Sequence, residues 1–166
     1  MRRILLAGGA GYVGTSLTRE LLNRNYDVTI VDLLWFKTDL PKGVVVWNKN
    51  IMDMNVEELN GFDAVVFLAG LSNDPMANFN PSMNFVENAA VPSYLAYISK
   101  MAGVPRFVYA SSCSVYGYTD NNLMDETDSV FPRYPYGVSK LEAEAAIMNM
   151  RDENFRPISL RKGTIG

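Results

Sequence analysis

The sequence predicts a three-layer α/β fold, in which helices cover both faces of a doubly wound parallel sheet. Two observations predict it. Short runs rich in Val, Ile and Leu alternate with longer segments of helical periodicity along the 166 residues. The short runs are also almost continuously apolar, as expected for parallel strands that are covered on both faces. The length fits one domain, so we expect a single domain over residues 1–166.

The six expected strands are near-continuous apolar runs bounded by polar or turn-forming residues. They lie near residues 3–7, 27–32, 44–48, 63–68, 105–111 and 157–161. Four helices are expected between them, near residues 12–24, 54–59, 83–102 and 137–151. The helix near 83–102 has an apolar stripe at helical spacing and ends at Gly103. Pro92 inside it predicts a kink or a later start.

Two stretches are rich in Gly, Asn, Asp and Pro and are expected to be loops, residues 69–82 and 117–135. The second has no clear periodicity and is long for a connection inside a compact domain. It is therefore expected to be functional or flexible rather than a passive connection.

Composition excludes several classes of protein and of site. A hydrophobic content of 48% and a charged content of 20% are typical of a soluble globular protein, which we expect to be cytoplasmic. A net charge of -3 without a basic stripe argues against a nucleic-acid partner, and no apolar run is long enough to span a membrane. One cysteine, Cys113, and no histidine exclude an internal disulfide and a Cys/His metal site. Acid–base chemistry must then fall to Tyr, Lys, Asp, Glu or Cys.

A glycine-rich turn follows the first strand and opens the first helix, with glycines at Gly8, Gly11 and Gly14. In dinucleotide-binding folds the first glycine permits a tight turn, the second lets the backbone approach a pyrophosphate, and the third allows helix and strand to pack closely. The first helical turn, which includes Tyr12 and Val13, offers free amides and a positive dipole end to phosphates. The spacing alone is also found in ordinary tight turns.

An acidic residue, Asp32, ends the second strand eighteen positions after Gly14, where a ribose-binding carboxylate is expected. A carboxylate there accepts hydrogen bonds from ribose hydroxyls and repels a 2′-phosphate, so NAD is favoured over NADP. The alternative is that Asp32 only caps a turn. The neighbouring Lys37 is the residue that could meet a 2′-phosphate.

A tyrosine and a lysine four residues apart, Tyr136 and Lys140, share one face of the last expected helix. An ammonium one turn from a phenol lowers its pKa, which is about 10 when unperturbed, and so makes it a better base. Tyr134, two residues earlier, is expected to point elsewhere. Without the glycine-rich turn, the same pattern would describe an exposed helical face.

Small hydroxyl residues, Ser111 and Ser112, stand at the carboxyl end of the fifth strand, where open α/β sheets bind ligands. The alternative is that these serines only satisfy a strand-to-loop turn.

Together these motifs resemble those of the extended short-chain dehydrogenase/reductases, a family that includes nucleotide-sugar epimerases and dehydratases. The resemblance covers the whole chain and rests on GGAGYVG at 8–14, Asp32, FLAG at 67–70, SSCSVYG at 111–117, YGVSK at 136–140 and LRKGTIG at 160–166. It implies a Rossmann-type fold that binds NAD and transfers a hydride from a nucleotide-linked sugar. Tyr136 would take the proton of a sugar hydroxyl, Lys140 would hold the nicotinamide ribose and tune Tyr136, and Ser112 would hydrogen-bond the same hydroxyl.

The resemblance also implies further cofactor contacts. Asn88 resembles the asparagine near the nicotinamide, although it could be an ordinary polar helix residue. The other expected contacts are Asn50, Ile51, Leu68, Ala69, Gly70 and Ser111. Asn50 replaces an aspartate that many members hold against the adenine, and its carbonyl is expected to accept from the adenine amino group instead. Gly70 replaces a common alanine, which is expected to make no difference.

Departures from the family pattern discriminate among reactions. Sugar-nucleotide 4,6-dehydratases place Asp-Glu where this chain has Cys113 and Ser114, and enzymes like GDP-fucose synthase use a cysteine at the position of Ser114 together with a histidine. The pattern in this chain, a serine followed by two small residues and then Val-Tyr-Gly, fits the simple 4-epimerases best. The sugar, the nucleotide and the pathway are left open.

Family members usually have about as much chain again after the sixth strand, so we expect the substrate domain to be absent from these residues. The helices near 83–102 and 137–151 carry apolar stripes on the surfaces through which relatives dimerise, and a homodimer is expected. Two alternatives to an epimerase remain. One is a cofactor-binding module without independent catalysis, and the other is an NAD-sensing scaffold, which would have no use for Tyr136 and Lys140.

Overall fold

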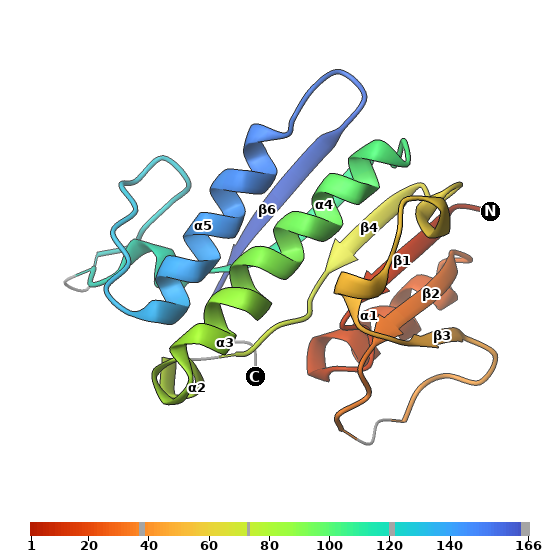
Figure 1. Ribbon diagram of the computed structural model, residues 1–166, viewed down its shortest axis with the longest axis horizontal. Coiled ribbons are helices and arrows are strands. Elements are labelled where there is room, and N and C mark those ends of the chain that lie inside the picture. The colour runs from red at the N-terminus through yellow and green to blue at the C-terminus, as the bar shows by residue number, and fades with distance from the viewer. Residues whose placement is uncertain (37–38, 73, 120–121, 164–166) are drawn as a thin grey trace.

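A computed structural model describes residues 1–36, 39–72, 74–119 and 122–163. It confirms the expected parallel sheet, whose six strands run in the order β3-β2-β1-β4-β5-β6. The chain starts in the middle of the sheet, builds one half outward and then returns to build the other half (Figure 1). The order therefore reverses between β1 and β4, and open α/β sheets bind ligands at the carboxyl ends of the strands beside such a reversal.

All six strands lie close to their expected positions. They are β1 (Arg3–Ala7), β2 (Asp27–Asp32), β3 (Val45–Asn48), β4 (Ala64–Phe67), β5 (Arg106–Ser112) and β6 (Arg156–Lys162). The α-helices are α1 (Tyr12–Asn23), α2 (Asp74–Phe79), α3 (Pro81–Phe85), α4 (Val91–Met101) and α5 (Pro135–Asn149). Within the described ranges, no helix has the length and apolar character needed to cross a membrane.

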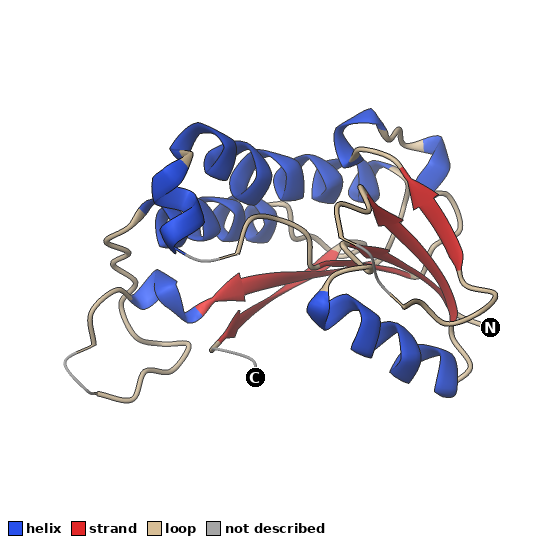
Figure 2. Cartoon of the chain, turned by 90° about the horizontal axis from the view of Figure 1, so that it is seen from below, coloured by secondary structure: helices blue, strands red, loops and turns tan. Residues whose placement is uncertain are grey.

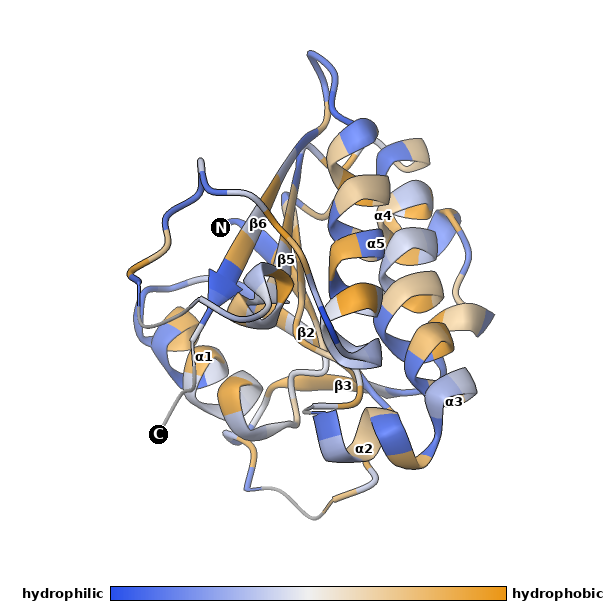
Figure 3. Ribbon diagram, turned by 90° about the vertical axis from the view of Figure 1, so that its left-hand side faces the viewer, coloured by the Kyte–Doolittle hydropathy of each residue, from blue (hydrophilic) through white to orange (hydrophobic). Residues whose placement is uncertain are grey.

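Helices α3 to α5 lie over one face of the sheet and α1 lies under the other (Figure 2). Alternate strand residues face the two layers, so Leu5 packs in the larger core under α4 and α5, while Leu6 packs on the α1 side. The strands between the layers are largely hydrophobic (Figure 3). The second face is covered less fully than expected. On the α1 side, Ile158 and Leu160 of β6 are 47% and 48% exposed.

The expected helix at 54–59 is wrong. The segment forms two separate 3₁₀ turns, Ile51–Asp53 and Glu57–Leu59. Asn55 and Glu58 hydrogen-bond each other's backbone amides, which is the reciprocal cap that starts a helix. The chain then turns at Gly61, whose φ is +79°, and enters β4. The residues that would start an α-helix are therefore present, but the segment before β4 is too short for one to form.

The expected loop at 69–82 is only partly irregular, because α2 and the first residues of α3 lie inside it. Pro75 and Pro81 stand at the starts of these helices, where proline is favoured since its missing N–H has no intrahelical partner. The expected loop at 117–135 contains no helix or strand in its described part before α5 begins at Pro135.

The expected helix at 83–102 starts earlier, at Pro81, and is divided into α3, a π-helical turn at Val86–Ala90, and α4. Pro92 follows the π-helical turn as one of the first two residues of α4. The predicted kink thus takes the form of a locally widened turn, a feature that is often found at functional sites. Asn88 lies in the middle of it.

Candidate functional site

The glycine-rich turn joins β1 to α1 and brings three segments into close contact. Gly8 has φ +81°, and a Cβ there would lie 2.5 Å from the backbone nitrogen of Ala69. A Cβ at Gly14 would lie 2.6 Å from Gly9 Cα, so this glycine lets α1 approach the turn. A Cβ at Gly11 would meet only Gly8 O, at 3.3 Å. Gly11 therefore leaves free space in front of the helix N-terminus.

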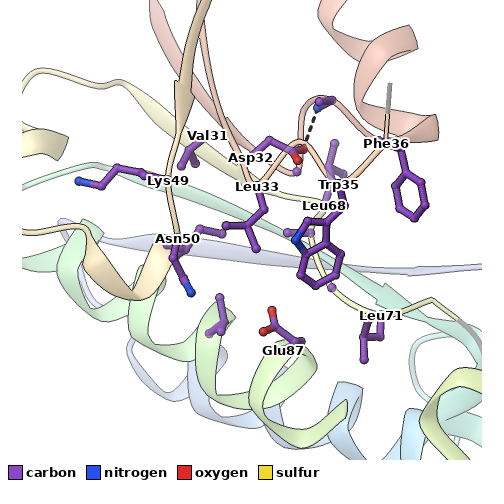
Figure 4. A pocket seen from close by; sticks show the side chains of 17 residues that line it. Val31, Asp32, Leu33, Trp35, Phe36, Lys49, Asn50, Leu68, Leu71 and Glu87 are labelled. Atoms are coloured by element: carbon purple, nitrogen blue, oxygen red, sulfur yellow. Dashed lines mark hydrogen bonds between the residues drawn. The ribbon is translucent and has the colours of Figure 1, made fainter. Parts of the chain in front are cut away.

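A cavity of about 160 Å³ opens at the carboxyl ends of β1, β2 and β4. It includes several expected cofactor contacts, Gly8, Gly11, Asp32, Asn50, Ile51, Leu68, Ala69 and Gly70. Lys49, Leu71, Glu87 and Val91 also line it, together with Val31, Leu33, Trp35 and Phe36, which come from the end of β2 and the segment after it (Figure 4). A volume of this order holds about one aromatic ring. Of the other expected contacts, Tyr12 is 72% exposed, and neither it nor Val13 lines the cavity.

Asp32 ends β2 at the edge of this cavity, with both carboxylate oxygens in hydrogen bonds. Oδ2 accepts from the amide of Ala10 at 3.0 Å, and Oδ1 accepts from the amide of Leu34 at 2.9 Å. These bonds hold the carboxylate beside the glycine-rich turn. An ionised carboxylate has about four acceptor sites, so each oxygen can still accept from a ribose hydroxyl. Lys37 lies outside the described residues.

The side chain of Asn50 is partly engaged within the chain. Its Oδ1 accepts from the amide of Met52 at 2.9 Å and caps the 3₁₀ turn that begins at Ile51. The amide nitrogen of Asn50 points into the cavity instead (Figure 4). This residue therefore turns a hydrogen-bond donor toward the cavity, which an aspartate could not do.

Gly70 is not equivalent to alanine, contrary to our expectation. Its φ is +122°, and a Cβ there would overlap Oδ1 of Asn88. The glycine is thus needed so that the chain after β4 can pass Asn88. Within the described residues, Asn88 Oδ1 is buried and forms no hydrogen bond.

Tyr136, Lys140 and Ser112 gather where β5 ends and α5 begins. Lys140 is only 5% exposed, and its Nζ donates to Ala110 O at 3.0 Å. The same Nζ lies 5.8 Å from the ring centroid of Tyr136. Ser112 donates from Oγ to Ser114 Oγ at 3.1 Å. The motif residues from two distant segments therefore share one edge of the sheet.

Electrostatics at this edge oppose charge on both groups of the pair. Burial, above all, raises the pKa of Tyr136, while the Ser112 hydroxyl lowers it. Burial lowers the pKa of Lys140 to about 7, with a further contribution from the charge of Lys162. Perturbed pKa values of this kind cluster at functional sites. Tyr134 pairs with the hydroxyl of Tyr118 and not with this site, as expected.

A buried amide network, which the sequence analysis missed, supports Tyr136. Asn84 Nδ2 donates to Ser139 Oγ at 3.2 Å, and Ser139 Oγ donates to the backbone carbonyl of Tyr136 at 2.8 Å. Asn88 Nδ2 in turn donates to Asn84 Oδ1 at 2.7 Å and to Leu71 O at 2.9 Å. The available signal was the pair of asparagines one helical turn apart on an otherwise apolar face.

A buried ion pair, also missed, fixes α5 to β6. Arg161 Nη2 and Nε donate to Glu144 Oε1 at 2.6 and 3.0 Å, and Ser159 Oγ donates to Glu144 Oε2 at 2.8 Å. Burial raises the pKa of Glu144, but the hydrogen bonds from Arg161 and Ser159 outweigh it, so the pKa is lowered overall. The buried Ser111 hydroxyl, close by, also lowers the pKa of Glu144. No group of His, Cys, Asp and Glu among these residues could hold a metal ion.

Comparisons with known proteins agree with this geometry. The sequence model of the NAD dependent epimerase/dehydratase family matches residues 4–165. UDP-glucose 4-epimerase 4 of Oryza sativa subsp. japonica is 29% identical over 159 residues, which are 86% of this chain and 43% of that protein. MoeE5 in complex with UDP-glucose and NAD is 30% identical with a TM-score of 0.83, covering 95% of this chain and 52% of that one.

A second solved structure is the NAD dependent NDP-hexosamine 5,6-dehydratase TunA, which is involved in tunicamycin biosynthesis. It is 28% identical with a TM-score of 0.88, covering 97% of this chain and 54% of that one. This chain thus spans about half the length of the relatives that it matches.

Proposed function

Because this chain belongs to the NAD-dependent epimerase/dehydratase family, we propose that it is the cofactor-binding and proton-transferring part of a nucleotide-sugar epimerase. The observation that carries this proposal is the shared position of two sites. The cavity beside Asp32 and the group of Tyr136, Lys140 and Ser112 both lie at the carboxyl edge of the sheet. In this proposal a single extended ligand occupies both.

The described residues fit an adenine dinucleotide. Gly11 leaves the space in front of α1 open, where the helix amides and dipole favour a pyrophosphate. The carboxylate of Asp32 is fixed by two amides and retains acceptor sites for ribose hydroxyls. A 2′-phosphate there would face a like charge, which favours NAD over NADP.

In this proposal, bound NAD would supply the hydride acceptor for a carbon of the sugar. Tyr136 would accept the proton of the hydroxyl on that carbon at its phenolic oxygen. Ser112 Oγ would donate to or accept from the same hydroxyl and so orient it. Protonated Lys140, 5.8 Å from the Tyr136 ring centroid, favours the phenolate over the phenol.

Cys113 and Ser114, next to Ser112, offer no carboxylate pair for elimination of water, so simple epimerisation is favoured over 4,6-dehydration. The relatives act on different sugar nucleotides, and the substrate is proposed only as a nucleotide-linked sugar. One of the similar solved structures, at 28% sequence identity, is a 5,6-dehydratase, so elimination is the second candidate reaction.

The test is Tyr136→Phe in the natural gene product, assayed with NAD and a panel of UDP-, GDP- and dTDP-sugars. General acid–base catalysis contributes about 10²–10⁴-fold, so turnover should fall by about that factor. Tyr134→Phe, two residues away and outside the pair, should retain turnover. Equal turnover of Tyr136→Phe and the unaltered protein would refute the catalytic assignment.

We also propose that the protein is a homodimer through the helical layer. Tyr97 and Met101 of α4 are 53% and 59% exposed, and exposed apolar side chains on one helix are typical of a protein interface. Sedimentation equilibrium should give about twice the chain mass of 18.5 kDa. A mass of one chain at all concentrations would contradict this proposal.

The alternative is a cofactor-binding module without catalysis of its own. It predicts that the 166-residue chain binds NAD and that Tyr136→Phe changes no reaction.

A further inference from the structure

Glu87 is an acid in the cavity that the proposed function does not use. It lies on the π-helical turn Val86–Ala90, and its carboxylate points into the cavity toward the segment after β2 (Figure 4). In the described part of the chain nothing forms a hydrogen bond or ion pair with it, and burial raises its pKa. The cation that shares the cavity, Lys49, is bound by Glu58 at 2.8 Å.

The walls around Glu87 fit a flat ring. Trp35 and Leu33 approach from the segment after β2 (Figure 4), and the apolar side chains of Val91 and Ile51 also line the cavity. Glu87 is only partly exposed, and burial disfavours its charged form, so a ligand group that donates a hydrogen bond would replace part of the hydration that the carboxylate has lost. That group must be a hydrogen-bond donor, because a carboxylate only accepts.

Asn50 completes the recognition pattern of the cavity. Its Oδ1 is committed to Met52 N, and its amide nitrogen points into the cavity. The cavity thus offers one acceptor at Glu87 and one donor at Asn50. The edge of adenine carries the complementary pair, since its exocyclic amino group is a donor and its ring nitrogens are acceptors.

We propose that Glu87 determines the base specificity of the cofactor site by accepting a hydrogen bond from the exocyclic amino group of adenine. The proposal rests on the proposed function, because it assumes that the adenosine half of NAD enters this cavity. Asp32 is separate from this role, since its oxygens are held beside the glycine-rich turn by Ala10 and Leu34. Glu87 is the other carboxylate among the described cavity residues.

The test compares NAD with nicotinamide hypoxanthine dinucleotide, in which a carbonyl oxygen replaces the amino group. Calorimetric titration of the 166-residue chain should show that the hypoxanthine analogue binds at least about tenfold more weakly, because Glu87 then faces a carbonyl oxygen and the Asn50 amide faces the N1–H group of the base. In Glu87→Gln the side-chain amide can either accept or donate. The preference for NAD should therefore fall below about threefold.

Glu142→Gln on the exposed side of α5 is the matched control, and it should keep the full preference. Glu87→Gln should fold, because it removes a charge that has no described partner, and its circular dichroism and thermal midpoint check this. The comparison of the two dinucleotides in the unaltered protein needs no variant at all.

Two failures can be told apart. If NAD itself does not bind, the proposed function fails together with this inference. If NAD binds but the hypoxanthine analogue binds equally well, or if Glu87→Gln keeps the preference, the assignment of Glu87 alone is overturned.

Discussion

Replacement of Lys140 by methionine should stabilise the folded chain, because the buried ammonium is unfavourable for folding. Methionine keeps an unbranched, flexible side chain in a position that is only 5% exposed. The pKa of Lys140 falls from its ordinary value of 10.5 to about 7 on folding. Between these values the unfolded chain binds more protons than the folded one, so the wild type gains stability as the pH rises through this window.

The size of the effect follows from the two pKa values. Each pKa unit corresponds to 1.36 kcal/mol, so burial of the charge costs about 4 kcal/mol at pH 7 and about 2 kcal/mol at pH 9. Methionine leaves Ala110 O without its donor, which costs about 1 kcal/mol. Lys140→Met should therefore be more stable than the wild type by about 3 kcal/mol at pH 7 and by about 1 kcal/mol at pH 9.

Urea unfolding at pH 7, 8 and 9 measures this difference directly. Lys100→Met is the control, because Lys100 is partly exposed and paired with Asp152 at 2.7 Å. Its loss should cost less than about 1 kcal/mol, with little change over the same pH range. A Lys140→Met variant that is less stable than the wild type at pH 7, or a difference that is constant with pH, would refute the reasoning.

The two remaining stability predictions concern the turn and the ion pair. Gly14→Ala should destabilise the chain by about 1–3 kcal/mol, because the new methyl group would lie 2.6 Å from Gly9 Cα. Gly11→Ala should keep the stability of the chain within about 1 kcal/mol but lose NAD affinity. Thermal unfolding measures the stabilities and calorimetry the affinities, and equal stability of the two variants would contradict the geometry. Glu144→Gln should cost about 3 kcal/mol at pH 7, since Arg161 would lose its partner. The folded pKa of Glu144 lies below 4.5, so its contribution is present above that pH and is lost as the pH falls through the folded value. Urea unfolding at pH 7 and pH 4 should therefore show a smaller deficit at pH 4, and a deficit that grows with acid would count against the ion pair.

The sheet could be predicted from the sequence because its inner strands are buried on both faces. Residues such as Leu5 and Val65 have no exposed surface, and their runs are correspondingly apolar. The elements that were predicted wrongly are short. Asn55 and Glu58 form a helical cap that is followed by a single 3₁₀ turn, and Pro75 and Pro81 start helices where proline was taken as a sign of a loop.

The glycine-rich turn and the Tyr136–Lys140 pair could be predicted from spacing, because the residues of each motif lie close together in the sequence. The glycines belong to one strand–helix junction, and Tyr136 and Lys140 are one helical turn apart. The missed residues depend on contacts across the fold. Asn84 bonds to Ser139, 55 positions away, and Glu144 bonds to Arg161 in a strand that follows much later. The side-chain direction of Asn50 could not be read from sequence either, since the cap of the next turn decides it.

The glycine-rich turn and Asp32 together form the proposed site for an adenine dinucleotide. Calorimetric titration of the 166-residue chain with NAD and with NADP tests it directly. We predict one NAD site per chain and an affinity for NADP that is at least about tenfold lower, because the 2′-phosphate would meet the Asp32 carboxylate. Tighter binding of NADP, or no binding of either dinucleotide, would contradict the account.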